Sequence, residues 1–177
     1  RELKKGKKIL TISGTALIIL AVGFLAFIIF SVMTLLSSLD TIREHPFRVI
    51  SAGRQLQTEI DNVRISFEQL RNINTPEVVE DIRQQIQVYY SDAQEQLDVM
   101  EESYLGDPED IANLSRLLEQ MRVETDGFLD YAAGDDRSGE EIVAYSTEHL
   151  DQITEEFDEQ LERILTYAEG RFDYFYH

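Results

Sequence analysis

The chain has 177 residues, 43% of them hydrophobic, and a formal net charge of −18. It contains no cysteine, which excludes a disulfide framework, a thiolate metal site and a cysteine nucleophile. The acidic surplus would repel a phosphate backbone, so nucleic acid is excluded as a partner.

The first eight residues carry a local charge of +4, and no charged side chain follows from Ile9 to Leu39. An uncharged, proline-free run of this length exceeds the roughly 20 residues that a helix needs to cross about 30 Å of hydrocarbon. A cleaved signal peptide would have a shorter apolar region of about 7–15 residues. We therefore predict a transmembrane helix at 9–39, in contact with membrane lipid. A wholly buried core helix is the alternative.

The charge is distributed unequally on the two sides of this run. The basic flank at 1–8 predicts a cytoplasmic N-terminus by the positive-inside rule. The remaining charge of −22 lies in 40–177, which we predict to be extracytoplasmic. The predicted location is therefore the cell membrane.

His45, Pro46 and Phe47 follow the uncharged run. A proline removes one backbone hydrogen bond of a helix and clashes with its preceding turn. It also disfavours helical geometry at the residue before it, His45. We predict that these three residues form a signalling hinge between the membrane helix and the outer domain. The alternative is a simple joint that sets the tilt of the domain.

Beyond the proline, apolar residues recur three and four positions apart, and no segment alternates with a period of two. This spacing predicts helices that each bury one stripe of side chains. The predicted stripes are Val49, Ala52, Leu56, Ile60, Val63, Phe67, Leu70 and Ile73; Val79, Ile82, Ile86, Tyr89, Ala93, Leu97, Met100 and Tyr104; Ile111, Leu114, Leu118, Met121, Thr125, Phe128 and Ala132; and Ile142, Tyr145, His149, Ile153, Phe157, Leu161, Ile164 and Ala168.

Helix-start signals occur at Thr75-Pro76, at Asp107-Pro108 and at Ser138-Gly139. We predict an all-α fold, in which the transmembrane helix is followed by four helices. Their short connections predict an up-down-up-down antiparallel four-helix bundle. The predicted helices cover about 47–73, 76–105, 108–133 and 139–176.

The string H-P-F-x-V, formed by His45, Pro46, Phe47 and Val49, stands between a charge-poor helix and a long amphipathic helix. This arrangement resembles the four-helix-bundle sensor domains of bacterial transmembrane receptors, which occur on methyl-accepting chemotaxis proteins, diguanylate cyclases and histidine kinases. The resemblance covers almost the entire chain. It implies a homodimer, a second membrane helix, a HAMP linker and a cytoplasmic output module.

The last residues, Tyr174, Phe175 and Tyr176, form an aromatic cluster of the kind found at membrane surfaces. We expect a second membrane span to begin just past His177. The alternative is an aromatic helix end that packs in a core or against a neighbouring molecule.

Catalytic motifs are not found in the sequence. His45, His149 and His177 are scattered, and none has the glutamate three residues earlier that di-iron bundles use. There is no phosphate-binding glycine loop and no nucleophile elbow. The acidic turn at 135–141 lacks EF-hand spacing, which favours a solvated loop over a calcium site. We predict no enzymatic activity, no cofactor and no metal site.

Three arginines are expected to meet aromatic side chains at the end of the bundle farther from the membrane. A guanidinium binds a carboxylate through two hydrogen bonds, so such a cluster would bind a small anionic metabolite. Ordinary salt bridges to the many acids are the alternative. His149 occupies a core position, where a hydrogen-bonded core histidine is the alternative to a ligand or a pH sensor. The predicted ligand-binding residues are Arg64, Arg71, Arg83, Tyr131, Tyr145 and His149.

Together these features predict the extracytoplasmic ligand-sensing region of a bacterial transmembrane signalling receptor. A small anionic metabolite, or a periplasmic or extracellular protein, would act as the signal. A displacement of about 1–2 Å of the fourth helix relative to the first would be the output. The alternative is a membrane-tethered helical interaction or spacer module without signalling.

Overall fold

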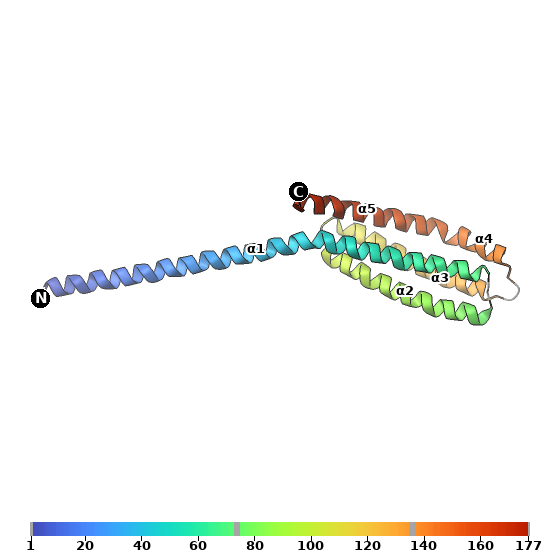
Figure 1. Cartoon of the computed structure of the whole chain (residues 1–177), viewed down its shortest axis with the longest axis horizontal. Coiled ribbons are helices and arrows are strands. Elements are labelled where there is room, and N and C mark those ends of the chain that lie inside the picture. Colours follow the sequence, from blue (N-terminus) through green and yellow to red (C-terminus); the bar gives the residue numbers. More distant parts are fainter. Residues whose placement is uncertain (1, 73–74, 135–136, 177) are drawn as a thin grey trace. The chain divides into compact units, whose positions relative to one another are not determined.

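The computed structural model describes residues 2–72, 75–134 and 137–176, with side chains described at 22–33 and from Glu44 to Tyr174 within these ranges. All regular structure in them is helical, and none of it is strand. The all-helical prediction is therefore confirmed for the described part of the chain. The helices are α1 (Glu2–Leu70), α2 (Pro76–Ser103), α3 (Pro108–Ala132), α4 (Gly139–His149) and α5 (Asp151–Tyr176), as labelled in Figure 1.

The chain divides into two compact units, Arg1–Ile42 and Arg43–His177. In the first unit the apolar side chains at 22–33 are exposed, with Phe30 72% accessible. Within the described residues, no helix combines the length and the apolar character that crossing a membrane requires. The side chains in the rest of the predicted span at 9–39, and those of the basic flank at 1–8, lie outside the described residues.

α1 continues through Pro46, whereas the sequence predicts a new helix at residue 47. A proline inside a helix costs about 3 kcal/mol, because it removes a hydrogen bond and clashes with the preceding turn. Here Pro46 is buried, and Val49 in the next turn is only 1% exposed. Packing of this turn within the second unit offsets the cost of Pro46, which the helix propensity of the neighbouring residues alone would not overcome.

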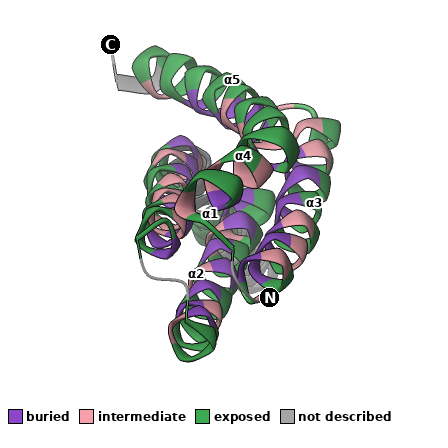
Figure 2. Cartoon of the chain, turned by 90° about the vertical axis from the view of Figure 1, so that its right-hand side faces the viewer, coloured by how far each residue is buried: buried purple, intermediate pink, exposed green. Residues whose placement is uncertain are grey.

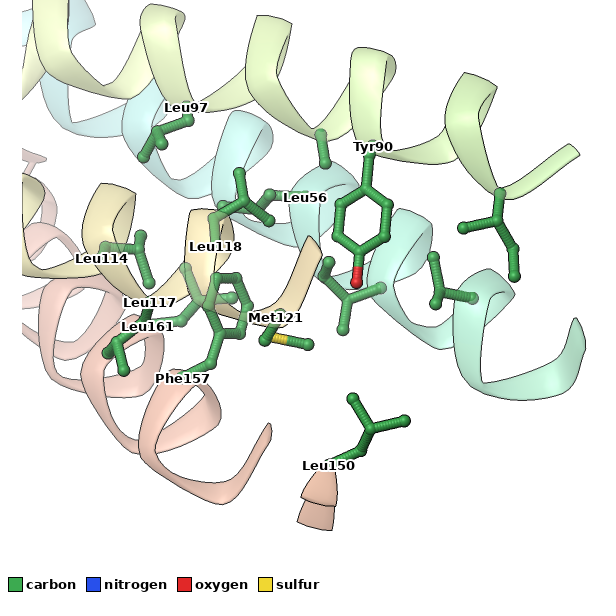
Figure 3. Packing of buried hydrophobic residues seen from close by; sticks show 14 of the residues in the cluster. Leu56, Tyr90, Leu97, Leu114, Leu117, Leu118, Met121, Leu150, Phe157 and Leu161 are labelled. Atoms are coloured by element: carbon green, nitrogen blue, oxygen red, sulfur yellow. The ribbon is translucent and has the colours of Figure 1, made fainter. Parts of the chain in front are cut away.

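The helices of the second unit share one apolar core, and their buried residues form stripes along the helices (Figure 2). Leu56, Leu97, Leu118 and Phe157 come from four different helices and belong to the cluster in Figure 3. Each is at most 4% exposed. Full burial of such a side chain contributes about 1.5–3 kcal/mol, so these stripes hold the unit together.

One position of the predicted stripe on α2 is wrong by a single residue. Tyr90, rather than Tyr89, is the buried tyrosine, at 6% exposure. Its hydroxyl lies 2.8 Å from Oγ1 of the buried Thr125 on α3. Tyr89 is half-buried, and its hydroxyl accepts a hydrogen bond from Gln85. A partner for the buried hydroxyl therefore decides which of two adjacent tyrosines points inward.

The predicted helix at 139–176 is interrupted, because α4 ends at His149 and α5 begins at Asp151. Ser146 Oγ donates a hydrogen bond to the Val143 carbonyl at 3.1 Å, a type of contact that bends helices. At this interruption the residue that faces the core differs by one position from the predicted residue. Leu150 is buried at 4% exposure, and His149, which the sequence places on the core stripe, is exposed.

Three helices begin at the residues that the sequence predicts, namely Pro76, Pro108 and Gly139. At the third, the Ser138 backbone N–H donates to Glu141 Oε2 at 2.8 Å, and the Glu141 N–H donates to Ser138 Oγ at 3.2 Å. This reciprocal capping box satisfies two N–H groups that a helix start leaves free. The hydrogen bond from the Ser138 backbone also lowers the pKa of Glu141.

The buried Tyr90 predicts a specific loss of stability at alkaline pH. Burial raises the pKa of Tyr90 from 10.0 to about 12, so the folded state holds this proton more tightly than the unfolded chain does. The resulting stabilisation is complete below pH 10 and is lost between pH 10 and about 12. We expect Tyr90 to account for about 2–3 kcal/mol of the decrease in unfolding free energy over that interval.

Urea unfolding at pH 9 to 12 measures this decrease. Tyr90→Phe should show a smaller decrease than the wild type, whereas the neighbouring Tyr89→Phe should match the wild type. Equal decreases in all three proteins would contradict the assignment.

The surroundings of Gly139 and Gly170 predict that substitution by alanine has opposite effects on stability at the two positions. A Cβ added at Gly139 would lie 2.2 Å from the Arg71 carbonyl oxygen, which the backbone cannot easily move. A Cβ at Gly170 would meet nothing within 4 Å. Gly139→Ala should destabilise the unit by about 1–3 kcal/mol. Gly170→Ala should stabilise it by up to about 1 kcal/mol through helix propensity. Thermal unfolding measures both changes, and equal signs would refute the close approach at Gly139.

Candidate functional site

Pro46 lies at one end of the second unit, which we call the proximal end. Its neighbour His45 is half-buried, with Nδ1 3.2 Å from the Ser103 carbonyl at the end of α2. A carbonyl can only accept, so Nδ1 donates this hydrogen bond. Phe47, the third residue of the predicted hinge, is 60% exposed. Two of the three predicted hinge residues are therefore packed inside the unit, and one is not.

A cavity of about 10 Å³ lies beside Pro46. Ser103 lines it, and its Oγ is buried with no hydrogen-bond partner among the described residues. Such an unpaired hydroxyl costs stability. The other lining residues are Val49, Tyr104, Leu105, Tyr167, Ala168 and Arg171.

Polar contacts tie the helices together around this cavity. Tyr104 donates its hydroxyl proton to Asp110 Oδ2 at 2.9 Å, and Tyr167 donates to the Leu105 carbonyl at 2.9 Å. The two tyrosine rings meet edge to face, with centroids 5.3 Å apart. Burial, together with the hydrogen bond to Asp110, raises the pKa of Tyr104. These contacts join α2 and α3 to α5.

Gln160 and Arg163 of α5 extend the same network. Gln160 Nε2 donates to the Asp110 carbonyl at 2.8 Å, and Arg163 lies 3.3 Å from Asp110 Oδ1. We call the whole network the proximal collar. The collar residues are His45, Ser103, Tyr104, Leu105, Asp110, Gln160, Arg163 and Tyr167.

α1 and α5 approach each other closely along their length. A Cβ on the buried Gly53 would lie 2.6 Å from Cδ2 of Leu165, so glycine permits the approach. Arg54 pairs with Glu169 at 3.0 Å, and Arg64 pairs with Asp158 at 2.6 Å. The first and last helices of the second unit are therefore in direct contact through both packing and ion pairs.

The predicted anion site is not assembled, because its three arginines are bound in separate ion-pair groups. Arg64 contacts Asp61 at 2.9 Å as well as Asp158. Arg71 lies 3.8 Å from Glu68. The arrangement matches the salt-bridge alternative that the sequence left open. Arg83 contacts Glu80 at 3.6 Å, Asp126 at 3.8 Å and Asp130 at 2.7 Å.

The aromatic half of the predicted site does come together. Tyr145 is sandwiched between Tyr131 and His149, with ring centroids 4.2 Å from each. The Arg137 guanidinium lies over the Tyr131 ring, 4.4 Å from its centroid. Phe128 packs beneath, 6.3 Å from Tyr145. We call Tyr131, Tyr145 and His149 the aromatic stack. It joins α4 to α3.

A groove of about 360 Å³ lies between α3 and the α4–α5 junction, and His149 is one of its lining residues. It carries four glutamates and no lysine or arginine, so an anionic ligand is disfavoured there. Across the described residues, no group of His, Asp or Glu side chains is arranged to hold a metal ion. The lining residues are Glu119, Gln120, Val123, Glu124, Glu148, His149, Gln152, Ile153 and Glu156.

A second groove of about 460 Å³ lies between α2 and α3 and includes Arg122. The Arg122 guanidinium already binds both carboxylate oxygens of Glu119, at 2.9 and 2.7 Å. These hydrogen bonds lower the pKa of Glu119. A ligand in this groove could therefore bind Arg122 only by displacing Glu119.

Among the collar residues, sequence reasoning assigned a role only to His45, and it assigned none to Arg137. In the sequence, Tyr104 marks only the end of an apolar stripe. Tyr167 stands next to the predicted core residue Ala168, and no sequence motif distinguishes it. A tyrosine just before the loop Leu105-Gly106-Asp107 could have suggested a contact with the next helix. The identity of its partner depends on tertiary packing.

No protein-family model, curated protein or solved structure matches this chain.

Ser103 and Ser66 offer a matched pair of substitutions. Both are buried on helices, but Ser66 Oγ donates to the Asn62 carbonyl at 2.9 Å, whereas Ser103 Oγ has no partner among the described residues. Ser103→Ala should stabilise the unit by about 1 kcal/mol, because it removes an unpaired buried hydroxyl. Ser66→Ala should be neutral or destabilising. Chemical unfolding measures both, and a loss of stability in Ser103→Ala would contradict the unpaired hydroxyl.

Proposed function

We propose that the chain is the extracytoplasmic sensing region of a bacterial transmembrane receptor. One uninterrupted helix, α1, contains both the charge-free run at 9–39 and the residues from Val49 onward that form one side of the core. This observation carries the proposal. A segment anchored in lipid would then be covalently continuous with a helix that responds to packing in the outer unit.

The proposed fine topology is an up-down-up-down antiparallel four-helix bundle, with α4 and α5 together forming the fourth member. Contacts at the two ends support it. His45 near the start of the bundle lies beside Ser103 at the end of α2, and Tyr167 near the end of α5 lies beside Leu105. At the opposite, distal end, Gly139 at the start of α4 lies against Arg71 at the end of α1. The chain would thus leave and approach the membrane at one end.

The proposed mechanism is a shift between two packings of the unit. A ligand or partner protein moves such an equilibrium only when it binds one packing more tightly than the other. The output would be a displacement of the last helix relative to the first of about 1–2 Å, the scale of helix shifts at subunit interfaces in allosteric transitions. The contacts of α1 with α5 at Gly53, Arg54 and Arg64 are the ones that such a shift would alter.

In this proposal the basic flank at 1–8 is cytoplasmic and the acidic unit is extracytoplasmic. The signal would be a small metabolite or a periplasmic or extracellular protein, received by a homodimer and relayed to a cytoplasmic output module. An anionic metabolite would have to displace a carboxylate from Arg64, Arg71 or Arg83, because each of these arginines already pairs with an acid. The competing function, a membrane-tethered spacer, would use the same topology without a change in packing.

The absence of native cysteine allows a direct test of membrane topology. Single cysteines are introduced at Lys5 and at the exposed Glu155, and intact cells are treated with a membrane-impermeant maleimide. We expect labelling at position 155 in intact cells and labelling at position 5 only after permeabilisation. Labelling of both positions, or of neither, in intact cells would overturn the proposed topology.

A second arm of the test separates a sensor from a spacer. The full chain in lipid nanodiscs is screened by thermal unfolding against small carboxylic acids, amino acids and amines. A sensor should gain several degrees in Tm with at least one class, because ligand binding stabilises the folded state by mass action. A uniform lack of response, with the topology confirmed, would favour the spacer or a protein signal.

A further inference from the structure

α4 is held on the core by far fewer buried side chains than the helix that follows it. In α4 only Ile142 is fully buried, whereas in α5 Phe157, Leu161 and Ile164 are each at most 1% exposed. Apolar burial supplies most of the force that keeps a helix on its core. α4 is therefore the most weakly anchored helix of the second unit.

The junction between α4 and α5 provides a point about which α4 can turn. Leu150 lies between the two helices with φ −112° and ψ −28°. Its N–H donates to the Ser146 carbonyl, and its own carbonyl accepts from the Thr154 N–H. The chain is thus regular on both sides of Leu150. A small change at this residue would redirect α4 while leaving both helices intact.

The aromatic stack is the main lateral contact that keeps α4 against α3. Tyr145 and His149 lie one turn apart on α4, and Tyr131 of α3 stacks on Tyr145 with an interplanar angle of 16°. Tyr131 is fixed from its other side by Arg137, whose guanidinium lies over the ring. Stacked rings hold a defined geometry, but half-exposed rings release more easily than a buried core.

Charge repulsion acts in the opposite direction on the neighbouring groove. Glu124 of α3 and Glu148 of α4 line the same groove, and neither makes an ion pair or hydrogen bond among the described residues. Like charges that line one groove disfavour a close approach of α4 to α3, and the lining includes no arginine or lysine to compensate them. The stack therefore favours contact between α4 and α3, and these carboxylates disfavour it.

From these opposing contacts we infer that α4 moves as a separate segment, turning about Leu150, and that the aromatic stack is the clasp that holds it closed on α3. The inference concerns the motion of this helix and does not depend on whether the chain is a receptor. Its failure would leave the proposed membrane topology intact.

Amide hydrogen exchange of the full chain in detergent tests the inference. In the wild type, amides of α4 should exchange at least about tenfold faster than those at 157–168 in α5. Tyr145→Ala should accelerate exchange of α4 by a further factor of about ten and leave 157–168 unchanged. Tyr145→Phe keeps the ring and should behave like the wild type. Tyr89→Ala, which removes a half-buried tyrosine from α2, should leave α4 unchanged.

A second variant tests the opposing force without removing any packing. Glu148→Gln should slow the exchange of α4 severalfold, because it removes one of the two repelling charges. Glu155→Gln, at an exposed acid of α5 outside the groove, should have no effect on α4.

The exchange rates of α4 and α5 in the variants Tyr145→Ala and Glu148→Gln decide whether the stack is a clasp. Faster exchange confined to α4 in Tyr145→Ala, with slower exchange in Glu148→Gln, supports the clasp. Exchange of α4 and α5 that rises together in Tyr145→Ala would show one cooperative helix and overturn the inference. An unchanged α4 in Tyr145→Ala would overturn it as well, because the stack would then not hold the helix.

Discussion

Each helix of the second unit buries only a narrow stripe of side chains, and this constraint governs the rest of the structure. A stripe with a spacing of three and four residues leaves most of each helix surface outside the core. Polar groups outside the stripe must find partners on the surface or at the helix ends. The specific contacts between helices therefore lie at the collar, along the α1–α5 contact, at the aromatic stack and between α2 and α3, where Tyr90 meets Thr125 and Arg83 pairs with Asp126 and Asp130.

The same constraint explains how much the sequence could predict. A buried stripe is a local property of one helix, so the positions from Val49 to Leu70 and from Ile111 to Ala132 follow from spacing alone. Which of Tyr89 and Tyr90 turns inward depends on Thr125 across the core, and no local pattern contains that information. His149 was misplaced by one position, since its neighbour Leu150 is the residue that packs inward.

The three arginines of the predicted anion site lie in separate ion-pair groups, and the excess of acids over bases in the chain explains why. Acids outnumber Lys and Arg by 34 to 16 in the chain, so an arginine on any helix face has carboxylates nearby. Arg83 alone contacts three of them. Exposed pairs of this kind contribute little stability each, but they occupy the guanidinium. Tyr131, Tyr145 and His149 do come together, because stacking of rings, unlike ion pairing, is restricted to a few positions near the core.

The two ends of the second unit are held together by different kinds of contact. At the proximal end the collar joins α1, α2, α3 and α5 through two tyrosines and directed hydrogen bonds. At the distal end α4 rests on one buried isoleucine and a half-exposed stack. A motion of α4 would reach the collar only through α5, whose Phe157 and Leu161 fix it on the core. At the collar, such a motion would therefore take the form of a small tilt or rotation of α5, because the buried contacts of α5 resist larger changes. If the chain acts as the proposed receptor, a coupling of this kind would keep the displacement passed on by α5 small.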